Sequence, residues 1–187
     1  MDNPETTAPA IAPENPGTLQ PDEIVVSVLE TDANGVRIKL WPDVQAVERR
    51  LEDLCGLLPA DQYSVRRYVC GRALYCSIAL DDTTRDAPCP AVYQVHSDAN
   101  TNEADGSFVA AAAAWGIGAG VFRLPPLRIG SNGVRINPVA GRDGKSIHHY
   151  ELADTLAVAE IKYADDGRVT NLKLRKQDGK VIVWAAN

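Results

Sequence analysis

The first recognisable pattern of hydrophobic and polar positions begins at Ile24. Residues 24–40 contain two β-rich apolar runs on either side of a turn-forming segment at 31–35, which is typical of a β-hairpin. The next segment, up to Gly56, places apolar side chains at positions 44, 47, 51, 54 and 55, which form a single stripe on a helix. Gly56 suits the end of that helix. We therefore predict a hairpin followed by an amphipathic helix.

The middle of the chain predicts further strands and a second helix. Residues 74–80 alternate between two faces, as in a half-buried strand. Residues 81–90 are rich in Asp, Thr and Pro and predict a turn, and residues 91–97 predict a returning strand. Five consecutive alanines within 103–115 favour a helix, and their small side chains allow another element to pack close to it.

The C-terminal part is rich in short β-patterned runs joined by turns, of which the last three predict a meander. These runs lie at 134–136, 147–150, 156–163, 168–176 and 180–184. Together the elements predict an α+β fold, with an antiparallel β-sheet and a helix packed across it (a β-β-β-α core) plus a β-rich C-terminal extension. The predicted domains are a leader at 1–22, an α+β core at 23–125 and the extension at 126–187.

Composition sets the N-terminal segment apart. Residues 1–22 are rich in Pro, Glu, Thr and Ala without a hydrophobic pattern, and predict a disordered leader because they cannot offset the entropy of ordering. The chain has a net charge of −6, but residues 1–36 hold seven acids and no bases, so residues 37–187 carry a net +1. The acidic total therefore does not exclude a polyanionic partner.

We expect a cytoplasmic protein with no membrane partner. Residues 1–23 lack the basic and apolar blocks of a signal peptide. The longest uncharged stretch, residues 106–122, is too short and too rich in Ala and Gly to span a bilayer. The four cysteines, at 55, 70, 76 and 89, have no C-x-x-C spacing, so we expect reduced thiols and no structural zinc site.

No motif supports catalysis or a cofactor. The Gly-Lys-Ser sequence at 144–146 lacks the phosphate-loop glycine, because position 139 is Val139. The glycines at 116–120 lack the third glycine of a dinucleotide fingerprint. His148 and His149 would point to opposite faces of a strand and cannot share a metal ion. We predict no enzyme activity, no cofactor and no metal, and keep open a Cys–His hydrolase that pairs His96 or His148 with one of the cysteines.

Basic residues are the most suggestive chemistry in the sequence. They gather at 66–72 and at 121–149, and tyrosines lie near the first group. Clustered arginines with aromatic rings are what a groove for single-stranded DNA uses, while the alternative is that they only keep sheet edges soluble. The predicted DNA contacts are Arg66, Arg67, Arg72, Arg123, Arg128, Arg135, Lys145 and Tyr75.

One stretch resembles a known family. The Ala-rich helix ends in Ala-Trp-Gly-Ile-Gly at 114–118, Phe-Arg-Leu-Pro follows at 122–125, and an acidic-tinged loop at 97–105 precedes the helix. This order is similar to the single-strand annealing proteins of the Rad-fifty-two superfamily, especially the phage Sak type. The resemblance covers residues 37–125.

The resemblance implies an ATP-independent protein that binds and anneals single-stranded DNA in phage or bacterial recombination or repair. It implies a homo-oligomeric ring or filament of cores side by side, with the DNA backbone in a basic groove. The family usually has a Lys-Arg pair where this chain has Val109 and Ala110, and an arginine and a tyrosine where it has Ala119 and Gly120. Either other arginines contact the DNA phosphates in place of these residues, or the protein has lost much of its affinity for DNA.

Two further expectations follow. The alternative function is an oligomeric interaction or structural module that keeps the fold and has lost most DNA affinity. The acidic leader is expected either to tether recombination proteins or to compete with DNA for the basic groove.

Overall fold

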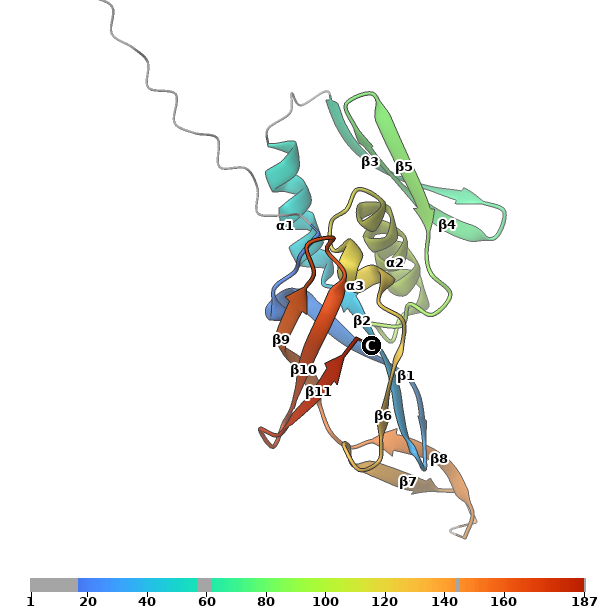
Figure 1. Ribbon diagram of the computed structural model, residues 1–187. Coiled ribbons are helices and arrows are strands. Elements are labelled where there is room, and N and C mark those ends of the chain that lie inside the picture. Colours follow the sequence, from blue (N-terminus) through green and yellow to red (C-terminus); the bar gives the residue numbers. More distant parts are fainter. Residues whose placement is uncertain (1–16, 57–61, 144, 187) are drawn as a thin grey trace, which may run out of the picture.

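The computed structural model describes residues 17–56, 62–143 and 145–186. The fold is α+β, as predicted, with antiparallel sheets and a helix packed across one of them (Figure 1). In chain order the elements are η1 (Pro21–Glu23), β1 (Ile24–Asp32), β2 (Gly35–Pro42), α1 (Val44–Cys55), β3 (Tyr63–Cys70), β4 (Ala73–Leu80), β5 (Thr83–Pro88), α2 (Ala99–Ala114), α3 (Ala119–Arg123), β6 (Leu127–Gly130), β7 (Ile136–Ala140), β8 (Ile147–Leu152), β9 (Leu156–Tyr163), β10 (Val169–Lys176) and β11 (Val181–Ala185).

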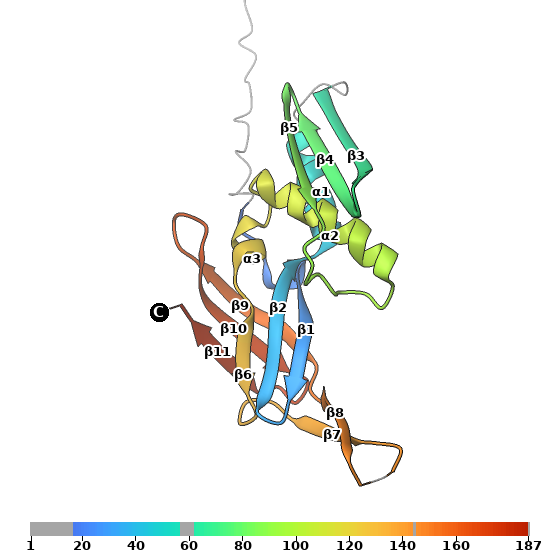
Figure 2. The ribbon, with the colours of Figure 1, turned by 90° about the vertical axis from the view of Figure 1, so that its right-hand side faces the viewer.

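A helical lobe contains the predicted β-β-β-α core. β3, β4 and β5 form an antiparallel sheet, and α2 packs across one face of it beside α1 (Figure 2). Cys76 and Ile78 of β4 are fully buried against Val109 of α2 and Val47 of α1, in one hydrophobic cluster. The small residues of α2 permit this approach, because a Cβ at Gly106 would lie 2.5 Å from Cys89 Sγ.

A second lobe is a β-sandwich that unites the two ends of the chain. The sheet β1-β2-β6 faces the meander β9-β10-β11, and both supply one hydrophobic core that includes Ile38 of β2, Ile129 of β6 and Leu172 of β10. Gly35 has φ +146 and lets β6 approach, because a Cβ there would lie 2.1 Å from the carbonyl oxygen of Ile129. The C-terminal extension therefore completes the core that the N-terminal hairpin begins, and the predicted boundary at 125/126 separates no independent core.

Four predicted elements differ from the structure. The strand expected at 134–136 is β7, which spans Ile136–Ala140 and shares only residue 136 with the prediction. The segment at 81–90 is largely strand β5, and residues 91–97 contain no strand. Asn102 explains the absence of a strand at 91–97, because its side chain accepts the N–H groups of Val95 and His96 and donates to the carbonyl of His96, in place of a strand partner. α2 begins at Ala99, four residues earlier than predicted, since the Asp98 side chain accepts the N–H of Thr101 at 2.6 Å.

Part of the predicted leader belongs to the fold. Leu19 is 1% exposed, and the Tyr163 hydroxyl accepts from its N–H at 3.0 Å and donates to its carbonyl at 2.9 Å. Glu23 of η1 accepts two hydrogen bonds from the Arg50 guanidinium of α1. The prediction of disorder is thus wrong for residues 17–22, and residues 1–16 lie outside the described residues. Among the helices described, none has the length and apolar character to cross a bilayer.

A buried lysine connects the two lobes. Lys39 of β2 is 4% exposed, and its Nζ donates to the carbonyl oxygens of Val121, Phe122 and Leu124 at the end of α3. A cation is favourable there because the carbonyl oxygens at the end of a helix carry a partial negative charge and most of them lack intrahelical partners. Burial lowers the pKa of Lys39 to about 8, which still leaves most of the side chain charged at neutral pH.

The substitution Lys39→Met tests this connection. It removes the Lys39 donor from three carbonyl oxygens, of which that of Val121 keeps the N–H of Leu124, and we expect a loss of about 2–4 kcal/mol in the free energy of unfolding, measured by urea denaturation. The control is Lys173→Met, which removes a half-exposed lysine paired with Glu160 and should change stability by less than about 1 kcal/mol. Equal losses in the two variants would contradict the assigned role.

The substitution Glu23→Gln tests the attachment of η1 to α1. Burial alone would raise the pKa of Glu23, but hydrogen bonds from Arg50 and from the Gln20 N–H outweigh it and lower the pKa. The unfolded state then binds more protons than the folded state as the pH falls below about 4.5, so the stabilisation is present at neutral pH and is lost in acid. Thermal melts should show E23Q less stable than the wild type at pH 7, with the difference shrinking towards pH 3. A stability difference between E23Q and the wild type that is the same at pH 3 and pH 7 would contradict the assigned role of Glu23.

Candidate nucleic-acid interface

The face of the β3-β4-β5 sheet opposite α2 is exposed to solvent. Side chains alternate across a sheet, so residues paired across strands share a face. Cys76 and Ile78 of β4 point to α2, which leaves Tyr75 and Ser77 on the other face. The register adds further residues to this outer face, namely Ser64, Arg66 and Tyr68 of β3 and Thr84 and Asp86 of β5.

Two tyrosines form a flat aromatic platform on the outer face. Tyr68 and Tyr75 are directly paired, and their rings stack with centroids 5.5 Å apart and an interplanar angle of 18°. The Tyr68 hydroxyl donates to Asp86 Oδ2 at 3.1 Å, which holds the ring across β4. Desolvation and this hydrogen bond raise the pKa of the Tyr68 phenol. Tyr68 is 41% exposed, so the platform is accessible to a ligand.

The neighbouring arginines Arg66 and Arg67 point to opposite faces of the sheet. Arg66 is paired with Ser77 on the outer face, two residues from Tyr68. Arg67 is paired with Cys76 and lies over the Phe108 ring, 6.0 Å from its centroid, on the α2 side. Arg72 lies in the turn between β3 and β4. Neither Arg66 nor Arg72 has an ion-pair partner within the described ranges, so both are available to an anion.

The prediction that all the basic residues line one groove is wrong. Arg128 of β6 binds Asp32 of β1 at 2.7 Å, and Arg135 binds the buried Asp154 at 2.9 Å. Lys145 lies between β7 and β8, at the end of the molecule far from β3-β4-β5 (Figures 1 and 2). The reason is that α3 and β6 carry the chain out of the helical lobe into the sandwich. Of the predicted contacts, the outer face unites Arg66 and Tyr75, with Arg72 at the adjoining turn.

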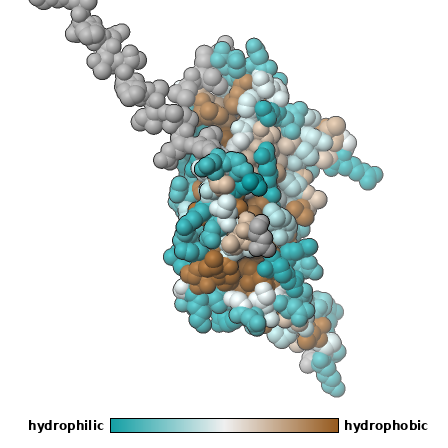
Figure 3. Space-filling model, in the orientation of Figure 1, coloured by the Kyte–Doolittle hydropathy of each residue, from teal (hydrophilic) through white to brown (hydrophobic). Residues whose placement is uncertain are grey.

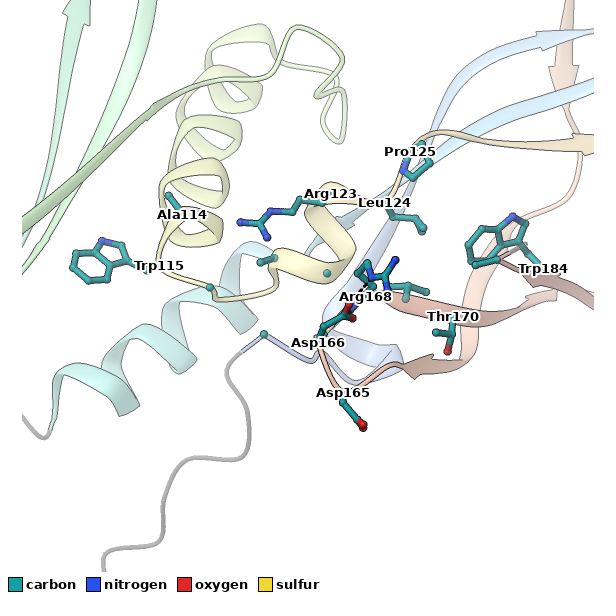
Figure 4. A pocket seen from close by; sticks show the side chains of 17 residues that line it. Ala114, Trp115, Arg123, Leu124, Pro125, Asp165, Asp166, Arg168, Thr170 and Trp184 are labelled. Atoms are coloured by element: carbon teal, nitrogen blue, oxygen red, sulfur yellow. Dashed lines mark hydrogen bonds and ion pairs between the residues drawn. The ribbon is translucent and has the colours of Figure 1, made fainter.

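Arg123 lies in a separate cavity of about 1020 Å³ between the end of α2, α3 and the β9–β10 turn (Figure 4). Trp115 and Trp184 line it, as does Arg168, whose guanidinium is held by Asp166 at 2.6 Å. Trp115 is fixed in place, because its Nε1 donates to the carbonyl of Ile78 at 3.0 Å. Arg123 has no ion-pair partner among the described residues.

Close packing beside this cavity explains why Gly120 differs from the residue that the resemblance implies. Gly120 of α3 packs on the β9–β10 turn so closely that a Cβ would lie 2.2 Å from the carbonyl oxygen of Gly167. The tyrosine that the resemblance implies at this place cannot be accommodated. Val109 and Ala110 are 0% and 7% exposed on the buried side of α2, so a Lys-Arg pair there would be inside the core.

A smaller cavity of about 560 Å³ brings Cys89 and His96 together, which bears on the hydrolase alternative. His96 Nε2 lies 3.0 Å from Asp105 Oδ2, as in a nucleophile–base–acid arrangement. However, the Cys89 thiol donates to the carbonyls of Pro90 and Asn102, and burial raises its pKa. A protonated, engaged thiol is a poor nucleophile, so the geometry gives this alternative little support. His148 lies on β8 in the other lobe, where its ring contacts His149.

Searches of protein-family models, curated proteins and solved structures give no match to this chain. Across the described segments, His, Cys, Asp and Glu side chains form no group of three or more that could hold a metal ion. The functional assignment therefore depends on the geometry of the two lobes.

Alkylation with iodoacetamide tests the environment of the cysteines. Cys70 is exposed at the end of β3, whereas burial raises the pKa of Cys55, Cys76 and Cys89. We expect mass spectrometry of peptides to show Cys70 modified first and the other three much more slowly, because only the thiolate reacts. All four should react in urea. Rapid modification of Cys89 in the folded protein would instead favour an activated thiol beside His96.

Proposed function

We propose that this protein binds single-stranded DNA on the outer face of the β3-β4-β5 sheet and anneals complementary strands without ATP. In this proposal it acts as a homo-oligomer in cytoplasmic recombination or repair. The observation that carries the proposal is the stacked pair Tyr68 and Tyr75 beside the unpaired Arg66 on an open sheet face. The resemblance at 114–118 and the β-β-β-α arrangement support the same conclusion.

The chemistry of the outer face suits single strands better than a duplex. Aromatic rings stack on bases of any sequence, and a base is available for stacking only when it is unpaired. Along the β3-β4 hairpin, the tyrosine pair lies between Arg66 and the turn that holds Arg72, so positive charge for phosphates is available at both ends of the pair, and the hydroxyls of Ser64 and Ser77 add hydrogen bonds. Annealing follows because charge neutralisation reduces the repulsion between two strands. No step requires a nucleotide cofactor.

A second candidate is an oligomeric interaction module with little affinity for DNA. The burial of Val109 and Ala110 favours it, because no cation can contact phosphates from those positions. Asp86 also adds a negative charge to the outer face, beside Tyr68. The two candidates differ in whether the protein binds an oligonucleotide at low salt.

Fluorescence anisotropy with a labelled oligo-dT tests the first candidate. Arg66→Ala should weaken binding and lower the slope of log K against log salt by about 0.7, the value for one lost phosphate contact on a single strand. Tyr75→Leu keeps an apolar side chain and removes the stacking ring, and should weaken binding by about 5- to 150-fold. The control Arg128→Ala removes an arginine already held by Asp32 and should change affinity little.

The wild-type measurement separates the candidates. Binding that weakens steeply as salt rises, and that is weaker still in Arg66→Ala and Tyr75→Leu, supports the DNA-binding part of the proposal. Annealing of complementary strands by the same protein supports the annealing part. Large assemblies without binding to the oligonucleotide at low salt would contradict it and favour the interaction module. Deletion of residues 1–16 tests whether the acidic leader competes with DNA, since affinity should then rise, and circular dichroism of the deleted protein checks that it remains folded.

A further inference from the structure

Strand β11 differs from the other strands that lie at sheet edges. Natural edge strands avoid pairing with other chains by means of charged residues, proline or bulges. In the described part of the chain, each other edge strand has such a feature: β1 has a bulge, β3, β6 and β9 carry charged side chains, and β5 carries charges and Pro88. The short β7-β8 pair contains Pro138 and Glu151. β11 reads Val-Ile-Val-Trp-Ala and has no charge, proline or bulge.

The free edge of β11 presents a regular row of backbone groups. Ala186 donates its N–H to Thr170, and Lys176 donates to the carbonyl of Lys180, so the even-numbered residues of β11 bond to β10. Bonded and non-bonded pairs alternate in an antiparallel ladder, and the N–H and C=O groups of Val181, Val183 and Ala185 therefore point away from β10. Within the described residues β11 pairs with β10 alone. A row of this kind is complementary to an extended strand.

The side chains of β11 have the character of a strand in the middle of a sheet. Val181 and Val183 are 50% and 61% exposed on the outer side, while Ile182 and Trp184 point to the inner side. The inner side adjoins a cavity of about 270 Å³ between β11 and β6, which Leu127 also lines. Figure 3 shows a hydrophobic band over this region of the surface. Strands that are apolar on both sides are normally covered on both sides.

We propose that β11 pairs antiparallel with β11 of a second copy of this chain, so that the two meanders form one continuous sheet across a twofold axis. The register that satisfies the outward-pointing backbone groups is centred on Val183, which meets its own copy. Val181 then lies opposite Ala185, and the pairing forms about six backbone hydrogen bonds. The interface lies in the sandwich lobe and does not depend on the proposed DNA site.

The self-complementary sequence of β11 is the reason for choosing a second copy. In the register centred on Val183, Ile182 lies opposite Trp184 of the partner strand, and an aromatic ring beside a β-branched side chain is a favourable cross-strand pair. Lys180 lies opposite Ala186, so no like charges are directly opposed. The leader of this chain is a poor occupant, because its prolines at 4, 9, 13 and 16 lack the N–H groups that a ladder needs.

Light scattering of the full chain tests the proposal. Val183→Lys places a charge at the centre of the edge, where the exposed side chain leaves the fold intact, and we expect the mass of the assembly to fall by about twofold or more. The matched control is Val69→Lys on β3, where a valine 72% exposed lies at the edge of the other sheet. Circular dichroism checks that both variants remain folded, and Val183→Thr repeats the test with a residue that favours strands.

Cross-linking tests the register. In a protein with Cys70→Ser, Val183→Cys should form an intermolecular disulfide under mild oxidation, since the two copies of residue 183 meet at the axis, and Val181→Cys alone should not. A monomeric wild type, a V183K mass equal to the wild type, or a fall in mass in V69K alone would each overturn the proposal. Oligonucleotide binding by V183K reports separately on the DNA proposal, because Val183 lies in the other lobe.

Discussion

The contact between Lys39 and the end of α3 holds in place the segment through which the chain passes from the helical lobe to the sandwich. A buried ammonium needs several acceptors, and the end of α3 supplies three carbonyl oxygens close together. This contact fixes α3 against β2 and so fixes the direction in which the chain leaves the helical lobe. β6 then reaches the free side of β2, and the residues after it complete the sandwich. The C-terminal meander is placed by this contact as much as by its own core.

The surface proposed for DNA binding and the edge proposed for self-association lie on different lobes. In the helical lobe α1 and α2 cover one face of a three-stranded sheet and leave the other face to solvent, with its aromatic platform and unpaired arginines. The sandwich ends in the unprotected apolar edge of β11. Separate surfaces would allow an oligomer to form without obstructing a bound strand, and that separation is what a protein that brings two DNA strands together needs.

The sequence predicts those helices and strands whose hydrophobic pattern lies within one short segment of the chain. The stripe at positions 44–55 gave α1, and the alternation at 156–163 gave β9 with its bounds. The sequence does not predict β3 and β6 as strands because each carries arginine among its apolar residues, and β6 is in addition only four residues long and pairs with the distant strand β2. The segment at 91–97 was wrongly predicted as a strand because the competing donor and acceptor, the Asn102 amide, comes from the next helix. The candidate site cannot be predicted from the sequence for the same reason. That Arg66 and Arg67 lie on opposite faces follows only once both are known to belong to β3.

The contact between Gly120 and Gly167 has an evolutionary consequence. Because the backbone carbonyl of residue 167 occupies the space of a side chain at position 120, that position cannot accept a larger residue while the β9–β10 turn keeps its path. A descendant that acquired a larger residue at position 120 of α3 would first have to shorten or displace the β9–β10 turn. Glycine at 120 is thus tied to the path of the β9–β10 turn, and a chain without that turn would have room for a side chain at that position.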